Sequence, residues 1–124
     1  MAKILTIEDD SKFVRVLEKI LGVRGHEVIH ASTALSGLRM AECEEVDLVL
    51  LDIDLPDLDG KVVATTLRSR PCMTDVPIIA VTAQDDATTR RLVKAYGCNG
   101  YIPKPIDTRA FPEQIETFLS GSSR

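Results

Sequence analysis

The stretch Val46–Gly60, VDLVLLDIDLPDLDG, joins a strand pattern to a cluster of acids. Its first half is a nearly continuous apolar run, typical of a central strand in a parallel sheet that is covered on both faces. Four aspartates follow it closely: Asp52, Asp54, Asp57 and Asp59. Pro56 and Gly60 mark a turn after the strand. Ligand sites in open α/β sheets form at the carboxyl ends of the strands, so Asp52 lies where a functional site is expected.

Short apolar segments alternate with helical patterns along the rest of the chain. Besides the central run, strands are predicted at residues 3–7, 27–31, 76–81 and 100–103. Helices are predicted from Asp10 or Ser11 to about Gly22, from Ser32 or Thr33 to about Glu44, from about Asp59 to Ser69, from Asp85 or Asp86 to Gly97, and from Asp107 to about Leu119. Pro112 removes a hydrogen bond from the last helix, which therefore begins later or bends. This alternation predicts an α/β fold, a three-layer sandwich in which five helices cover a five-stranded parallel sheet.

Length and charge limit the classes of function. The chain has 124 residues, of which 44% are hydrophobic, so it can form one domain with its own core. We assign residues 1–120 to that domain and expect residues 121–124 to be a disordered tail or a linker stub. A net charge of -4 argues against direct binding to nucleic acid or to an anionic membrane. No signal peptide or membrane span is visible, which predicts a cytoplasmic location.

The cysteines give no sign of a metal or redox site. There are three, Cys43, Cys72 and Cys98, without a CxxC pair and without a matching cluster of histidines. Because the cysteines are odd in number and widely spaced, we expect them to be reduced thiols with structural roles.

The predicted topology gathers polar residues from several strand ends around one crevice: Glu8, Asp9, Asp52, Thr82 and Lys104. Crowded carboxylates repel each other unless a hard divalent cation such as Mg²⁺ neutralises them. The cation would also bind phosphate oxygens, a lysine would supply further positive charge, and a hydroxyl would bind a phosphoryl oxygen. This set therefore suits phosphoryl transfer onto Asp52 as the nucleophile.

The sequence closely resembles the receiver domain of two-component response regulators over nearly its whole length. The matching motifs are ILTIEDD at the first strand, LLDIDLPDLDG around Asp52, AVTA at the fourth strand and GYIPKP at the fifth. Four motifs in the right order make the resemblance specific. It implies the flavodoxin-like strand order 2-1-3-4-5 and a cis peptide bond at Lys104–Pro105.

The resemblance also implies a role for each matched residue. Asp52 is the phosphoacceptor, and the metal pocket consists of Glu8, Asp9, Asp52 and the main-chain carbonyl of Asp54. Thr82 is the switch hydroxyl, Lys104 binds phosphate, and Tyr101 is the aromatic residue whose rotamer reports the state. The implied cofactor is Mg²⁺, with Mn²⁺ as an alternative.

The implied function is that of a phosphoacceptor switch in a phosphorelay. A histidine kinase or phosphotransfer protein donates the phosphoryl group, and a downstream protein binds the surface of the fourth helix, fifth strand and fifth helix, roughly Asp85 to Leu119. The chain is then a monomer or a phosphorylation-dependent dimer. Its own catalysis is limited to phosphorylation from phosphodonors and slow autodephosphorylation.

Two positions depart from the commonest receiver pattern. Asp54 has a carboxylate where many receivers have an uncharged side chain, which bears on the lifetime of the phosphoryl group. Pro103 removes an amide donor from the end of the fifth strand. Asp57 and Asp59 are expected only to form the turn and cap a helix.

A phosphohydrolase of the haloacid dehalogenase type is the rival hypothesis, because Asp52 and Asp54 match its nucleophile and general acid. Leu55 and Pro56 do not fit that family's motif. In addition, the further acids lie upstream, at Glu8 and Asp9, and no cap domain for a substrate is present. A degenerate receiver that serves only as a docking surface is a third alternative, which the intact set of residues disfavours.

Overall fold

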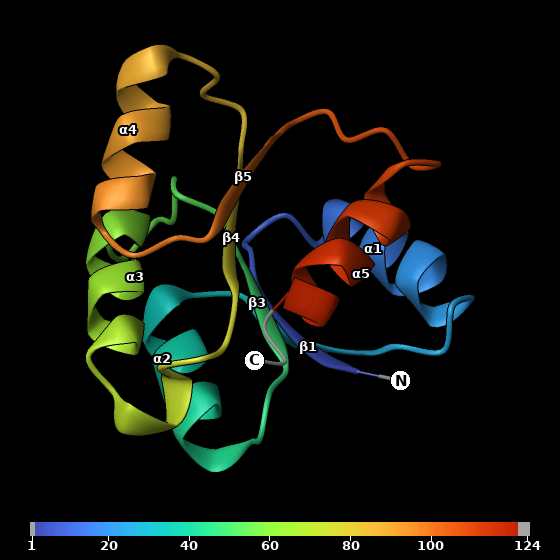
Figure 1. The fold of residues 1–124 in the computed structure, drawn as a ribbon, viewed down its shortest axis with the longest axis horizontal. Coiled ribbons are helices and arrows are strands. Elements are labelled where there is room, and N and C mark those ends of the chain that lie inside the picture. The colour runs from blue at the N-terminus through green and yellow to red at the C-terminus, as the bar shows by residue number, and fades with distance from the viewer. Residues whose placement is uncertain (1, 122–124) are drawn as a thin grey trace.

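The computed structural model describes residues 2–121. Strands and helices alternate as predicted (Figure 1). The strands are β1 (Lys3–Ile7), β2 (Glu27–Ala31), β3 (Leu48–Leu51), β4 (Ile78–Thr82) and β5 (Gly100–Pro103). The helices are α1 (Ser11–Gly22), α2 (Ala34–Cys43), α3 (Gly60–Arg68), α4 (Ala87–Ala95) and α5 (Phe111–Gly121), with a short 3₁₀ turn, η1 (Pro71–Met73), that the sequence did not predict.

The five strands form one parallel sheet in the order β2-β1-β3-β4-β5. This confirms both the fold class and the strand order. β4 begins at Ile78, two residues later than predicted, and includes Thr82. Before it, the Pro77 carbonyl accepts a hydrogen bond from Val49 N at 2.9 Å, but proline has no amide hydrogen to continue the ladder.

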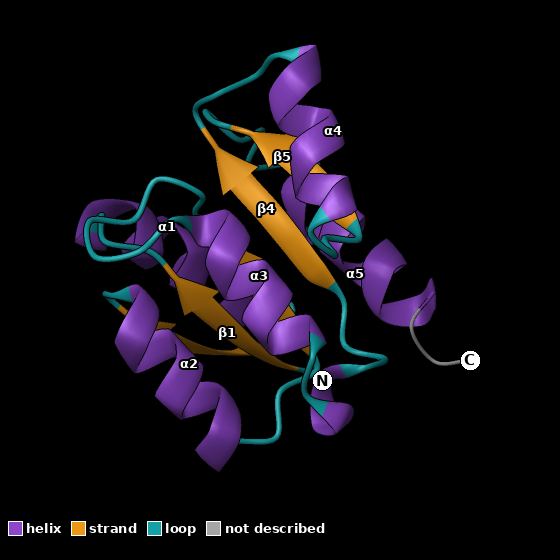
Figure 2. Cartoon of the chain, turned by 90° about the vertical axis from the view of Figure 1, so that its left-hand side faces the viewer, coloured by secondary structure: helices purple, strands orange, loops and turns teal. Residues whose placement is uncertain are grey.

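The sheet separates two apolar layers, because neighbouring residues of each strand point to opposite faces. On one face Leu5, Val49 and Ala80 pack with α2, α3 and α4. On the other face Ile4, Leu50 and Ile79 pack with α1 and α5. Figure 1 shows the two helical layers on either side of the sheet, and Figure 2 looks onto the layer of α2, α3 and α4. The structure is therefore the predicted three-layer sandwich.

Side chains at the helix starts agree with the predicted caps. Asp10, Thr33, Asp59 and Asp86 are the N-cap residues of α1, α2, α3 and α4, and each accepts a hydrogen bond from a backbone amide. Asp57 also serves a helix start, but at a distance, since its carboxylate accepts from Ala34 N and Leu35 N of α2 at 2.9 and 3.1 Å. Both acids after the central turn thus stabilise helix ends.

The last helix begins at Phe111, four residues later than the predicted Asp107, so of the two alternatives that Pro112 left open the later start is the one observed. Pro112 is its second residue, where the missing amide hydrogen costs no helical bond. Asp107 lies outside the helix and accepts from Arg109 N at 3.0 Å. Gly121 is the last residue of α5, and the rest of the expected tail, residues 122–124, lies outside the described residues.

Three further findings concern the predictions made from the sequence. The Lys104–Pro105 peptide bond is cis. The three cysteines are unpaired, and burial raises the pKa of the Cys98 thiol to about 11, which keeps it protonated. Within residues 2–121, no helix is long and apolar enough to cross a membrane.

Candidate functional site

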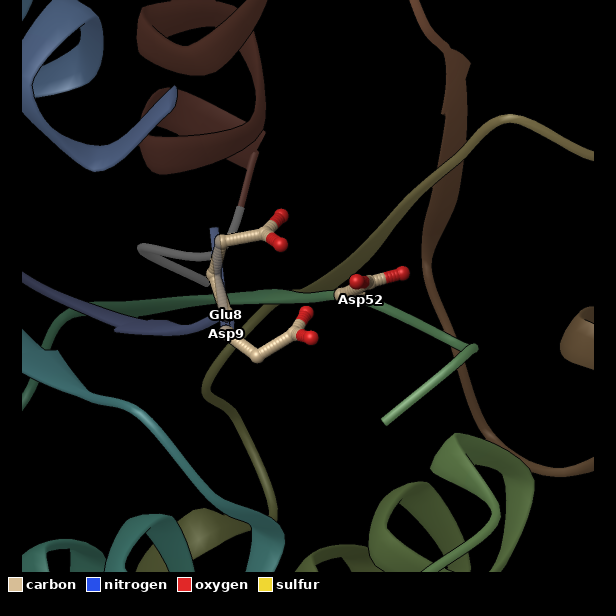
Figure 3. A group of neighbouring side chains, drawn as sticks. All are labelled: Glu8, Asp9 and Asp52. Atoms are coloured by element: carbon tan, nitrogen blue, oxygen red, sulfur yellow. The ribbon is translucent and has the colours of Figure 1, made fainter. Parts of the chain in front are cut away.

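Three carboxylates gather at the carboxyl end of the sheet. Glu8 and Asp9 follow β1, and Asp52 follows the neighbouring strand β3. One oxygen of each lies within 4.8 Å of the others. Glu8 and Asp52 are buried, with 2% and 7% of their surface exposed, whereas Asp9 is exposed. Figure 3 shows the side chains of Glu8 and Asp9 reaching toward the side on which Asp52 lies. The sequence predicted this group correctly.

Lys104 supplies the positive charge of the site. Its Nζ donates to Glu8 Oε1 at 2.7 Å and lies 3.8 Å from Asp52 Oδ2. The ammonium also lies 4.6 Å from the centroid of the Phe13 ring in α1, a distance suited to a cation–π contact. The phenyl ring and the two acids together fix the direction of this side chain.

Burial raises the pKa of the Glu8 carboxyl to about 7. The hydrogen bond from Lys104 opposes this rise in pKa, and the nearby charge of Asp52 adds to it. Without a cation, a proton on Glu8 therefore relieves part of the repulsion in the cluster. A hard divalent cation bound by the carboxylate oxygens would relieve the same repulsion, so the donor set fits such an ion.

The backbone of Glu8 is tied to β2. Glu8 N donates to Ala31 O at 3.0 Å, and His30 Nε2 lies 2.8 Å from Glu8 O, to which it donates. Asp10 N donates to Glu8 Oε2 at 3.2 Å. This contact of His30 could not be predicted, because nothing in the local sequence pattern shows that its side chain reaches back to the end of β1.

Asp52 is held by backbone groups of neighbouring segments. Its amide donates to Ile7 O at 3.0 Å, and its Oδ1 accepts from Asp54 N at 3.1 Å. Gly60 packs directly on this loop: a Cβ atom there would lie 2.5 Å from Ile53 Cα. Only glycine permits this close approach, so Gly60 contributes to the placement of Asp52.

Thr82 ends β4 and is fully buried. Its hydroxyl oxygen accepts from Gln84 N at 3.2 Å and lies 3.4 Å from Asp54 Oδ2, to which it donates. Asp54 Oδ1 accepts from Gln84 Nε2 at 2.9 Å. The side chain of Asp54 is therefore directed to Thr82 and Gln84 and is not part of the three-carboxylate group. Gln84 had no predicted role, because an amide in a loop has no distinctive sequence signal.

Tyr101 lies on the α4 side of β5. Its ring is half-buried against the core, and the guanidinium carbon of Arg90 in α4 lies 5.2 Å from the ring centroid. The phenolic oxygen is buried, and the Arg90 guanidinium is the charged group that interacts with it from α4. Arg90, Val93 and Tyr101 line a cavity of about 300 Å³ between α4 and β5.

Comparison with known proteins agrees with this geometry. The sequence model of the response regulator receiver domain matches residues 4–116. PhoP of Bacillus subtilis, an alkaline phosphatase synthesis transcriptional regulatory protein, is 35% identical over 120 residues, which are 97% of this chain and 49% of PhoP. The polar-differentiation response regulator DivK of Brucella ovis is 30% identical over 119 residues, 96% of this chain and 97% of DivK. The chain thus spans about half of one relative and nearly all of the other.

A solved structure supports the same assignment. The receiver domain of the sensor histidine kinase PA1611 from Pseudomonas aeruginosa has a TM-score of 0.88 and is 28% identical, with coverage of 96% of this chain and 98% of that one. That structure has a magnesium ion coordinated in its active site cleft. Given a family match over most of its length, the chain belongs to the response regulator receiver domains, the phosphoacceptor switches of two-component signalling.

Proposed function

We propose that Asp52 is the residue that accepts the phosphoryl group. The observation that supports this most directly is the juxtaposition of Asp52 with two further carboxylates and with Lys104 at one end of the sheet. The carboxylates of Asp57 and Asp59 accept hydrogen bonds from backbone amides at the starts of α2 and α3. The carboxylate of Asp54 binds Thr82 and Gln84. Asp52 is the aspartate of this segment that lies both in the acidic group and near the lysine.

The metal pocket consists of Glu8, Asp9, Asp52 and the main-chain carbonyl of Asp54. Mg²⁺ suits these oxygen ligands, and Mn²⁺ is the alternative. When bound, the ion neutralises charge on the carboxylates and on the transferring phosphoryl group. Burial raises the pKa of the Glu8 carboxyl, so such neutralisation would favour its ionised form.

The other residues of the site act on the phosphoryl group. A carboxylate oxygen of Asp52 forms the new bond to phosphorus while the bond to the donor's leaving group breaks. Lys104 already lies 3.8 Å from Asp52 Oδ2, where it can bind a phosphoryl oxygen. The Thr82 hydroxyl turns to donate a hydrogen bond to another phosphoryl oxygen. The side chain of Tyr101 then moves toward the space that the Thr82 hydroxyl has left.

Family membership makes the chain a signalling switch and not a catalytic enzyme. The phosphohydrolase hypothesis is therefore rejected. The paired aspartates that suggested it, Asp52 and Asp54, have different surroundings, since Asp54 donates its amide to Asp52 while its carboxylate faces Thr82.

A receiver domain implies a histidine kinase as partner. Beyond this, we propose that a phosphotransfer protein is an alternative donor and that a downstream protein binds the face of α4, β5 and α5. The cavity lined by Arg90, Val93 and Tyr101 supports this choice of face, because it lies between α4 and β5 beside the proposed switch residue. We expect no direct binding to nucleic acid or to a membrane. We also propose that the protein is a monomer or forms a dimer only when phosphorylated. A cytoplasmic location stays a prediction.

The test is phosphorylation by acetyl phosphate with Mg²⁺. Mass spectrometry should show the addition of a single phosphoryl group to the wild type and none to Asp52→Asn. Asp59→Asn is the matched control, because it removes a charge from the same loop while asparagine still caps α3. That variant should be labelled as the wild type is. Undiminished labelling of Asp52→Asn would show that the acceptor is another residue.

A further inference from the structure

The carboxylate of Asp54 makes contacts that phosphoryl transfer does not explain. Its two oxygens bind different side chains: Oδ1 accepts from Gln84 Nε2 at 2.9 Å, and Oδ2 accepts from the Thr82 hydroxyl at 3.4 Å. Asp54 itself is exposed, whereas Thr82 is fully buried. An exposed carboxylate thus lies over the one polar group of a buried side chain.

The Thr82 hydroxyl has a single hydrogen, so it cannot donate to two acceptors at once. Its oxygen already accepts from Gln84 N at 3.2 Å, and its hydrogen is directed to Asp54. A phosphoryl oxygen on Asp52 would require the same hydrogen. The bonds of Thr82 to Asp54 and to the phosphoryl group are therefore mutually exclusive.

Gln84 connects this competition to the start of α4. While its Nε2 holds Asp54, its Oε1 lies 3.4 Å from the hydroxyl of Thr89. That hydroxyl donates at a shorter distance, 3.0 Å, to Asp86 Oδ2, and Thr89 N donates to Asp86 Oδ1 at 2.8 Å. Asp86 is the N-cap residue of α4. The side chain of Gln84 therefore spans from Asp54 to the first turn of the helix.

We infer that Asp54 and Gln84 are positioning residues that hold the Thr82 hydroxyl in its unphosphorylated orientation, in competition with the phosphoryl group. This inference rests on the proposed role of Asp52. It differs from simple repulsion between Asp54 and the phosphoryl group, because repulsion does not require the hydroxyl of Thr82. Through this competition, Asp54 stabilises the unphosphorylated state relative to the phosphorylated state.

A double-mutant cycle separates competition for the Thr82 hydroxyl from charge repulsion between Asp54 and the phosphoryl group. Affinity for beryllofluoride, a phosphoryl analogue, is measured with Mg²⁺ by ¹⁹F NMR in the wild type, Asp54→Ala, Thr82→Val and the double variant. Asp54→Ala should raise the affinity in both backgrounds, but by about three- to tenfold more where the Thr82 hydroxyl is present, the worth of one hydrogen bond. Gln84→Met should give a smaller gain that likewise depends on Thr82.

Controls distinguish this inference from the proposed function. Asp59→Asn removes a charge from the same loop without touching Thr82, so its effect should be small and equal in both backgrounds. An equal gain for Asp54→Ala with and without the hydroxyl would overturn the competition and leave repulsion as the role of Asp54. Beryllofluoride binding that survives in Asp52→Asn would instead overturn the acceptor assignment. Thr82→Ala serves as a second hydroxyl-free background should Thr82→Val not fold.

Discussion

The carboxyl of Glu8 illustrates the cost of building this site. It is buried at the end of β1, next to Asp52, and the bond from Lys104 does not fully offset the desolvation of its charge, so its pKa is raised from 4.5 to about 7. An acid with a raised pKa in the folded state stabilises that state while it is protonated. The stabilisation is complete below about pH 4.5 and is lost as the pH rises through about 7.

We predict that the free energy of unfolding, measured with a chelator present, decreases between about pH 5 and about pH 8 through Glu8, by on the order of 2 kcal/mol. Urea denaturation at both pH values is the measurement. Glu8→Gln should remove this part of the pH dependence and be more stable than the wild type at the higher pH. Glu18→Gln, which changes an exposed carboxylate of α1, should keep the wild-type slope. If the free energy of unfolding of Glu8→Gln depended on pH as strongly as that of the wild type, Glu8 would be excluded as the titrating group.

At the scale of elements, the features that could be predicted are those encoded locally. Apolar periodicity located the five strands and five α-helices, although α5 begins four residues after the predicted Asp107 and η1 was not predicted. Acids and hydroxyls located the caps of the first four helices to within one residue, including Thr33 and Asp86. The acidic group followed from topology alone, since parallel strands place their carboxyl ends together. The contacts of His30 with Glu8 and of Gln84 with Asp54 could not be predicted, because they depend on rotamers of side chains that meet only in the folded chain.

Arg68 shows how one side chain joins three elements opposite the site. At the end of α3, its guanidinium donates to Gly97 O, to Met73 O at 2.7 Å and to Asn99 Oδ1 at 2.7 Å. Gly97 has a positive φ of 108°, and a Cβ there would lie 3.2 Å from Arg68 Cγ. The turn between α4 and β5 thus packs directly on this arginine.

Arg68→Met should therefore destabilise the protein by about 2 to 4 kcal/mol, because it leaves several carbonyls without a donor. Thermal or urea denaturation measures the loss. Arg91→Met is the matched control, since Arg91 is exposed on α4, and it should change stability by less than about 0.5 kcal/mol. Phosphorylation of Asp52 should persist in both variants. Equal stability of the two variants would show that the bonds of Arg68 contribute no net stability.

Over the whole molecule, the site and the proposed partner face meet at β5 and at its neighbour in the sheet, β4. Thr82 ends β4, and Lys104 follows β5 and donates its amide to Thr82 O at 2.8 Å. Tyr101 lies on β5 beside a cavity that Arg90 and Val93 of α4 also line, and its ring contacts the Arg90 guanidinium. A change at Asp52 therefore has a short route to α4 and β5 through Thr82 and Tyr101, the proposed switch residues.

Amide hydrogen exchange should reveal this coupling. With beryllofluoride and Mg²⁺ bound, we expect exchange to change in α4, β5 and α5 as well as in the loops that touch Asp52, because the ligand shifts the population of existing states. Asp52→Asn under the same conditions is the control and should show no difference. The segment of α2 lies on β1 and β2, away from Thr82, and should change least. Differences confined to the loops around Asp52 would show that binding at the site does not reach the partner face.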